Sequence, residues 1–134
     1  MTKQHYHVPT AAPAPPTAWY SHCVKVGNWL YVTGQIPADP DNPDAPLPAD
    51  IAEQTELSFR NLERILTHVG YDLTDTVFAR VYLTDFERDY PRFNEVYRRY
   101  YPDDATLPGR TTVGVSKLAR DALVEIDLVL YREG

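Results

Sequence analysis

The chain has 134 residues, a single cysteine and a formal net charge of −6. A chain of this length can build one domain around a hydrophobic core, while the lone Cys23 excludes both an intramolecular disulfide and a zinc cluster made of cysteines. The acidic balance argues against broad contact with nucleic acid, and no run is apolar enough for a membrane span or a signal peptide, so we expect a soluble, cytoplasmic protein.

The first third of the chain is predicted to hold an arm, a hairpin and a loop. Residues 1–18 form the arm, because four prolines between positions 9 and 16 favour extended or polyproline backbone, and residues 19–134 form one domain. The turn Gly27-Asn28 joins strands predicted at residues 20–26 and 29–33. Proline and aspartate then dominate residues 38–48, which we expect to be an irregular surface loop.

A long amphipathic helix and a strand follow the loop. Asp50 and Glu53 have the spacing of a capping box, and apolar residues recur at helical spacing over residues 51–69 until Gly70. Residues 77–83 alternate with period two, which predicts a strand with two different faces.

The last part of the chain predicts one more helix and two strands. Asp89 and Pro91 open the helix and Pro102 helps to end it. Strands are predicted at residues 110–115 and 123–130. The order β-β-α-β-α-β-β predicts an α+β sandwich, with both helices on one face of a mixed sheet.

The helix-free face of this sheet has an unusual predicted composition. It should combine Arg, Glu, Asp and Thr side chains with large aromatic residues from other strands. Such a mixture suits an interface better than open water, so we expect a homo-oligomer. The aromatic candidates are Trp29, Tyr31, Phe78 and Tyr82.

Arg110 is the leading functional candidate, because it follows a Pro-Gly turn at the start of an otherwise uncharged strand. A planar guanidinium held there can bind a carboxylate through two hydrogen bonds. The alternative is an arginine that is merely solvated at a strand end.

Other chemistries find little support. His22 and Cys23 are adjacent in a predicted strand, so they point to opposite faces and cannot form a nucleophile pair. The remaining histidines, His5, His7 and His68, lack the spacing of metal ligands. The tyrosines at helical spacing, Tyr97, Tyr100 and Tyr101, are predicted to be core residues rather than base-stacking ones.

Four stretches of the chain resemble the RidA/YjgF family of imine deaminases, also described as the endoribonuclease L-PSP family. They are residues 31–37 (Tyr-Val-Thr-Gly-Gln-Ile-Pro), 81–85 with 93–97, 107–110 (Leu-Pro-Gly-Arg) and 124–126 (Val-Glu-Ile). The resemblance implies a homotrimer of chorismate-mutase-like subunits with active sites between neighbours. The implied reaction hydrolyses 2-imino or enamino acids to 2-keto acids and ammonia, without a cofactor or metal.

The resemblance also implies a set of site residues. Arg110 corresponds to the residue that binds the substrate carboxylate, and Glu125 to the acid that positions or activates water. Pairing with Arg110 would lower the pKa of Glu125 and burial would raise it, and Glu125 could instead be a structural partner of an arginine across the interface. The implied substrate-binding residues are Tyr20, Thr33, Gly34, Asn94 and Thr112.

The chain departs from the family pattern near these residues. Ala18-Trp19 replaces a common Gly-Pro before the site tyrosine, His22-Cys23 replaces Gln-Ala, and Thr112 replaces a common cysteine. These changes bear on the identity of the substrate more than on the reaction type. Two other functions rank below the deaminase. The second is a non-catalytic module that binds small carboxylates in the same cleft, and the third is an endoribonuclease.

Overall fold

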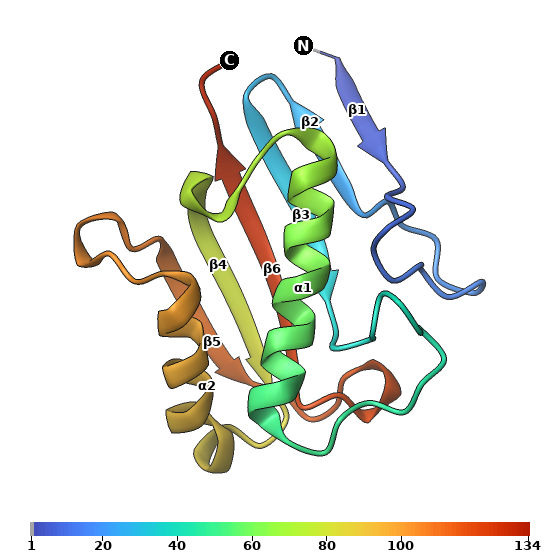
Figure 1. The fold of residues 1–134 in the computed structure, drawn as a ribbon, viewed down its shortest axis with the longest axis vertical. Coiled ribbons are helices and arrows are strands. Elements are labelled where there is room, and N and C mark those ends of the chain that lie inside the picture. Colours follow the sequence, from blue (N-terminus) through green and yellow to red (C-terminus); the bar gives the residue numbers. More distant parts are fainter. Residues whose placement is uncertain (1) are drawn as a thin grey trace.

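The computed structural model describes residues 2–134 as a single six-stranded sheet with two helices on one face (Figure 1). The strands are arranged in the order β1-β2-β3-β6-β4-β5, and β4 and β5 are parallel while all other neighbours are antiparallel. This mixed sheet confirms the predicted α+β fold. The strands are β1 (Lys3–Tyr6), β2 (Cys23–Val26), β3 (Trp29–Gln35), β4 (Thr76–Leu83), β5 (Gly109–Gly114) and β6 (Val124–Tyr131).

The helices are α1 (Ile51–Val69) and α2 (Phe86–Tyr100), and single 3-10 turns occur at Leu73–Asp75, Asp104–Thr106 and Ala119–Asp121. Helix α1 lies over the middle of the sheet and α2 over the β4–β5 edge (Figure 1). No helix within residues 2–134 has the length and apolar character to cross a membrane.

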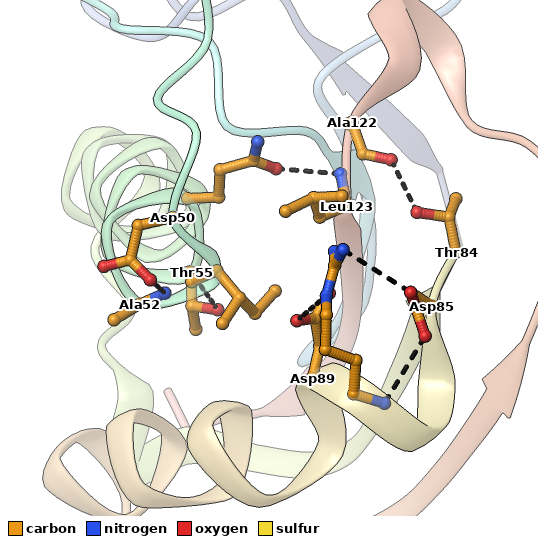
Figure 2. Close-up of polar contacts among 11 residues, drawn as sticks. Asp50, Ala52, Thr55, Thr84, Asp85, Asp89, Ala122 and Leu123 are labelled. Carbon is orange, nitrogen blue, oxygen red and sulfur yellow. Dashed lines mark hydrogen bonds and ion pairs between the residues drawn. The ribbon is translucent and has the colours of Figure 1, made fainter.

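Helix α1 begins and ends where the sequence predicts. The Asp50 carboxylate accepts a hydrogen bond from the Ala52 amide at 3.3 Å, and Figure 2 shows this contact. Gly70 ends the helix with φ of 81°, a left-handed conformation that glycine adopts without steric cost. The buried face carries Phe59, Leu62, Ile65 and Leu66 into the core.

The predicted start of α2 is wrong by about one turn. Asp85, not Asp89, caps the helix by accepting a hydrogen bond from the Arg88 amide at 3.4 Å (Figure 2). Pro91 consequently lies inside the helix as its sixth residue, where it has no amide hydrogen to donate to the Glu87 carbonyl. Asp89 is buried and bonds the Arg88 guanidinium at 2.9 Å.

The N-terminal arm contributes a sixth strand that the sequence analysis did not predict. Strand β1 pairs with β2 from Lys3 opposite Val26 to Tyr6 opposite Cys23, and Val8 beyond it is buried in the core. The His22 ring holds the following segment, because its Nδ1 accepts a hydrogen bond from the Val8 amide at 2.7 Å and its Nε2 lies 2.8 Å from the Ala12 carbonyl oxygen.

The predicted hairpin is confirmed as β2 and β3, although β2 begins at Cys23 rather than at residue 20. Gly27 in its turn has φ of 58°. Cys23 is fully buried on the helix side of β2, and burial raises the pKa of its thiol to about 11.

The two faces of the sheet differ as the alternation in β6 predicts. Its side chains at 124, 126, 128 and 130 are buried under the helices, whereas those of Glu125 and Asp127 project from the helix-free face. The strand registers place all four predicted aromatic residues, Trp29, Tyr31, Phe78 and Tyr82, on this helix-free face. Tyr31 is 51% exposed there. The expectation that the arginine of β5 shares this face is wrong, as the site geometry shows.

Candidate functional site

Arg110 lies on the helix side of the sheet, beneath α2. In the parallel register of β4 and β5 it pairs with Ala79, a fully buried residue of the helix-covered face. Its guanidinium donates hydrogen bonds from Nη2 to Asn94 Oδ1 at 2.9 Å and to the Tyr90 hydroxyl at 3.3 Å. The guanidinium carbon also lies 4.7 Å from the centre of the Tyr97 ring, within the range of a cation–π contact.

These contacts hold the guanidinium rigidly but do not neutralise it. Its partners are an amide oxygen, a hydroxyl and aromatic rings, so within residues 2–134 no carboxylate pairs with Arg110. Beside it is a pocket of about 260 Å³ that Asn94, Leu107 and Pro108 help to line. A charged donor fork at such a pocket is suited to a small anionic ligand.

Two buried hydroxyl groups near Arg110 have no hydrogen-bond partner within residues 2–134: Tyr97 OH and Thr112 Oγ1. Thr112 shares the helix-facing side of β5 with Arg110, because it pairs with the buried Val81. Buried hydroxyls normally find a partner, so these two are unusual, and Tyr97 also lines the pocket beside Arg110.

Glu125 belongs to a second cluster, on the helix-free face. A β-carbon placed on Gly34 would lie 2.8 Å from Cδ of Glu125, so the carboxylate packs directly against the glycine backbone. Tyr20 and Thr33 line the same pocket, whose volume is about 480 Å³. The Thr33 hydroxyl donates a hydrogen bond to the Ser21 carbonyl at 2.6 Å, which fixes the segment that carries Tyr20.

Burial decides the electrostatics of Glu125. Desolvation raises the pKa of its carboxyl, and the neighbouring Asp127 raises it further. Burial also raises the pKa of Tyr20, with Glu125 as the second cause. Asp127 is itself held by Arg80 at 2.7 Å and by the Tyr82 hydroxyl at 3.0 Å.

The predicted site residues therefore form two groups that one chain does not join. Arg110, Asn94 and Thr112 meet on the helix side, while Glu125 meets Tyr20, Thr33 and Gly34 on the opposite face. Within residues 2–134 no group of three or more His, Cys, Asp or Glu side chains is arranged to share a metal ion.

Three residues near the clusters were missed in the sequence. Tyr90 and Tyr97 contact the guanidinium of Arg110, although Tyr97 is also the core residue that its helical spacing predicts. Their position one turn to either side of Asn94 could have signalled this role. Arg120 lines the pocket of Glu125, and no local pattern in the sequence marks it.

Known proteins share this fold and much of this sequence. The Endoribonuclease L-PSP family model matches residues 10–131. A RutC family protein of Pyrococcus abyssi is 40% identical, over 88% of this chain and 90% of the relative. The 3-aminoacrylate deaminase RutC of Acinetobacter baylyi is 37% identical, over 87% of this chain and 90% of its own.

Solved structures agree with these relatives. A protein of Thermotoga maritima has a TM-score of 0.88 at 35% identity, over 99% of this chain and 100% of its own. Escherichia coli TdcF with bound serine has a TM-score of 0.87 at 29% identity, over 97% and 99%. Sequence and fold together show that the chain belongs to the RidA/YjgF family, whose family model carries the description Endoribonuclease L-PSP.

Proposed function

We propose that this protein hydrolyses 2-imino or enamino acids to 2-keto acids and ammonia. The observation that carries the proposal is the guanidinium of Arg110, which is held firmly by Asn94 and Tyr90 at a small pocket yet has no carboxylate partner among residues 2–134. Relatives named as deaminases, and one relative with bound serine, support a small amino-acid-derived substrate.

Arg110 would bind the substrate carboxylate and fix the position of the neighbouring C=N carbon. The Tyr97 and Thr112 hydroxyls, which lack partners within residues 2–134, would then be available to the rest of the substrate or to the attacking water. Fixing the substrate in this way lowers the entropic cost of the reaction, and the protonated imine is already electrophilic.

Glu125 would act as the general base. Its carboxylate takes a proton from water as the oxygen attacks the imine carbon, which gives a carbinolamine. The resulting carboxylic acid returns the proton to nitrogen. As the C–N bond breaks, the carbinolamine hydroxyl loses its proton to the Glu125 carboxylate, which passes it to the departing ammonia, and ammonium and the 2-keto acid leave. A raised pKa suits this exchange, because a base and acid work best near the operating pH. The reaction consumes one water and requires no metal or cofactor.

The proposed site is shared between chains, because the side chains of Arg110 and Glu125 lie on opposite faces of one sheet. A neighbouring copy would bring its Glu125 cluster to the Arg110 pocket, and a homotrimer repeats this arrangement three times. The helix-free face supports such packing, since Trp29, Tyr31 and Tyr131 are all at least one-third exposed on it.

The test is the release of ammonia and 2-keto acid from imines generated in situ by amino-acid oxidases. The wild type should accelerate the release, and Arg110→Ala should lower the acceleration about a hundredfold or more, the effect of losing a charge-assisted pair. Arg92→Ala is the matched control, because this arginine of α2 pairs with Glu95 at the surface.

If folded wild-type protein accelerates the hydrolysis of no imine, the proposed deaminase function is wrong. Binding of small carboxylates that still requires Arg110 would then favour the non-catalytic binding module.

A further inference from the structure

The turn before β6 has an unusual backbone. Arg120 and Asp121 have φ of 58° and 54°, and they are the only residues other than glycine with positive φ in residues 2–134. Side chains with a β-carbon adopt this conformation at a cost in free energy, so it persists only where the surroundings enforce it.

Arg120 extends from this turn to a distant loop. Its Nη1 donates a hydrogen bond to the Pro43 carbonyl and its Nη2 to the Ala45 carbonyl, each at 2.9 Å. The planar guanidinium fork suits two neighbouring carbonyls, which a single ammonium serves less well. The left-handed backbone therefore directs this side chain across to residues 43–45.

The turn is firmly fixed at its other side. The Thr84 hydroxyl donates a hydrogen bond to the Ala122 carbonyl at 3.2 Å, and the Leu123 amide donates to the Gln54 side chain at 2.8 Å (Figure 2). Arg120 thus connects the loop to a point that is anchored to the core and lies five residues before Glu125.

The loop is also fastened towards its start and at its end, where Gln54 donates to the Pro48 carbonyl at 2.6 Å. Asn61 donates to the Ala38 carbonyl at 2.7 Å, and Arg64 pairs with Asp41 at 2.8 Å. Arg120 holds the stretch beyond them, and Pro43 and Asp44 of that stretch line the pocket of Glu125. Between these ties, Arg120 is the one side chain within residues 2–134 that forms hydrogen bonds with residues 43–45.

We propose that Arg120 is a positioning residue, which holds residues 43–45 in place as one wall of the Glu125 pocket and so sets how tightly the substrate is held. This inference rests on the proposed deaminase function for its kinetic part only. Arg120 does not touch the reacting atoms in this scheme, so its loss should raise KM and leave kcat nearly unchanged.

The first test follows the loop itself, by proteolysis of the intact protein with an enzyme that cleaves before aspartate. Cleavage before Asp44 should be about tenfold faster in Arg120→Ala than in the wild type, because proteolysis reports local opening. Arg120→Gly should show the same acceleration, since glycine retains the left-handed backbone and loses only the side chain. Arg120→Lys should be intermediate.

Lys117→Ala is the control for this test. Lys117 stands in the same segment and forms an ion pair with Asp121, so its removal makes the same change in charge without touching residues 43–45. Wild-type cleavage rates in Arg120→Ala and Arg120→Gly, in protein that remains folded, would overturn the proposal whether or not the protein is a deaminase.

The second test measures kinetics with the best imine substrate. We expect KM to rise about tenfold in Arg120→Ala with kcat within about twofold, the pattern of lost uniform binding, and Arg120→Lys to recover part of it. If cleavage is faster but KM is unchanged, Arg120 holds the loop without any effect of the loop on substrate binding, and the proposal is refuted. Absence of wild-type activity would refute the deaminase, and the proteolysis result would still decide whether Arg120 holds the loop.

Discussion

Arg110 and Glu125 stand two strands apart in the same sheet, yet their surroundings differ in kind. The arginine is enclosed by its own chain, with Asn94 and Tyr90 as hydrogen-bond partners and the Tyr97 ring beside it. Glu125 lies on a face that bears exposed aromatic residues, against a glycine, with a raised pKa. In the proposed function, the Arg110 half of the site is enclosed within a single chain, whereas the Glu125 half lies on a face that a neighbouring copy would cover.

The strongest test of this comparison restores a site from two broken ones. Arg110→Ala and Glu125→Gln should each be nearly inactive. Mixed trimers of the two should recover about a quarter of the wild-type activity, because chance assembly of equal amounts pairs an intact arginine with an intact glutamate in one site of four. The measurement is ammonia release after co-expression or after joint unfolding and refolding.

Exchange of subunits between the variants would be verified by mass spectrometry. If the mixed trimers then recover no activity, the two residues do not act in a site shared between chains. Mixing each variant with itself under the same conditions provides the control.

Glu125→Gln alone should lower kcat about a hundredfold, a typical contribution of a general base. Only the ionised carboxylate can accept the proton, so wild-type kcat should fall as the pH drops through the pKa of Glu125. Because burial raises that pKa, the fall should begin at a higher pH than for an exposed glutamate. The residual activity of the variant should lack this acid limb, and an identical limb in both proteins would remove Glu125 from the role of base.

Gly34→Ala should lower kcat about tenfold by displacing the Glu125 carboxylate, a misplacement of about an ångström that catalysis tolerates poorly. The clash involves the end of a side chain, so circular dichroism should show an intact fold. Adding Glu125→Asp shortens the acid and should recover part of the loss. A fully active Gly34→Ala protein would mean that the close approach has no part in the reaction.

The smallest expected effect concerns stability. A carboxyl whose pKa is higher in the folded than in the unfolded chain binds protons more tightly when folded, so its contribution to stability falls as the pH rises through that range. Glu125→Gln should therefore be slightly more stable than the wild type at pH 7. The difference, from denaturant midpoints, should shrink towards pH 4, and a constant difference would contradict the assigned pKa direction.

Periodicity in the sequence was enough to predict most of the fold. Helix α1 and the hairpin follow from apolar spacing and turn residues that agree with each other. The start of α2 was misplaced because proline marks a first turn without fixing the residue before it, and Asp85 and Asp89 are both plausible caps by type. Strand β1 was missed because its polar residues gain their partners only from β2.

The site was predictable by residue more than by arrangement. The phase of β5 could not be read from Arg-Thr-Thr-Val, since neither alternate set of side chains is clearly apolar, so the direction of Arg110 needed the register with β4. Arg120 was beyond sequence reasoning, because left-handed positions are recognised by glycine, asparagine or aspartate and this one is an arginine.

Alkylation of Cys23 can report how often the sheet around β2 opens. The thiol is fully buried on the helix side of β2, and burial raises its pKa to about 11. While the sheet is closed, an alkylating reagent therefore finds neither access nor thiolate. It is also the only cysteine in the chain. Each labelling event in the wild type therefore records an opening of the N-terminal half of the sheet, and a new cysteine introduced at the surface could carry a dye or spin label with no need to remove the native one.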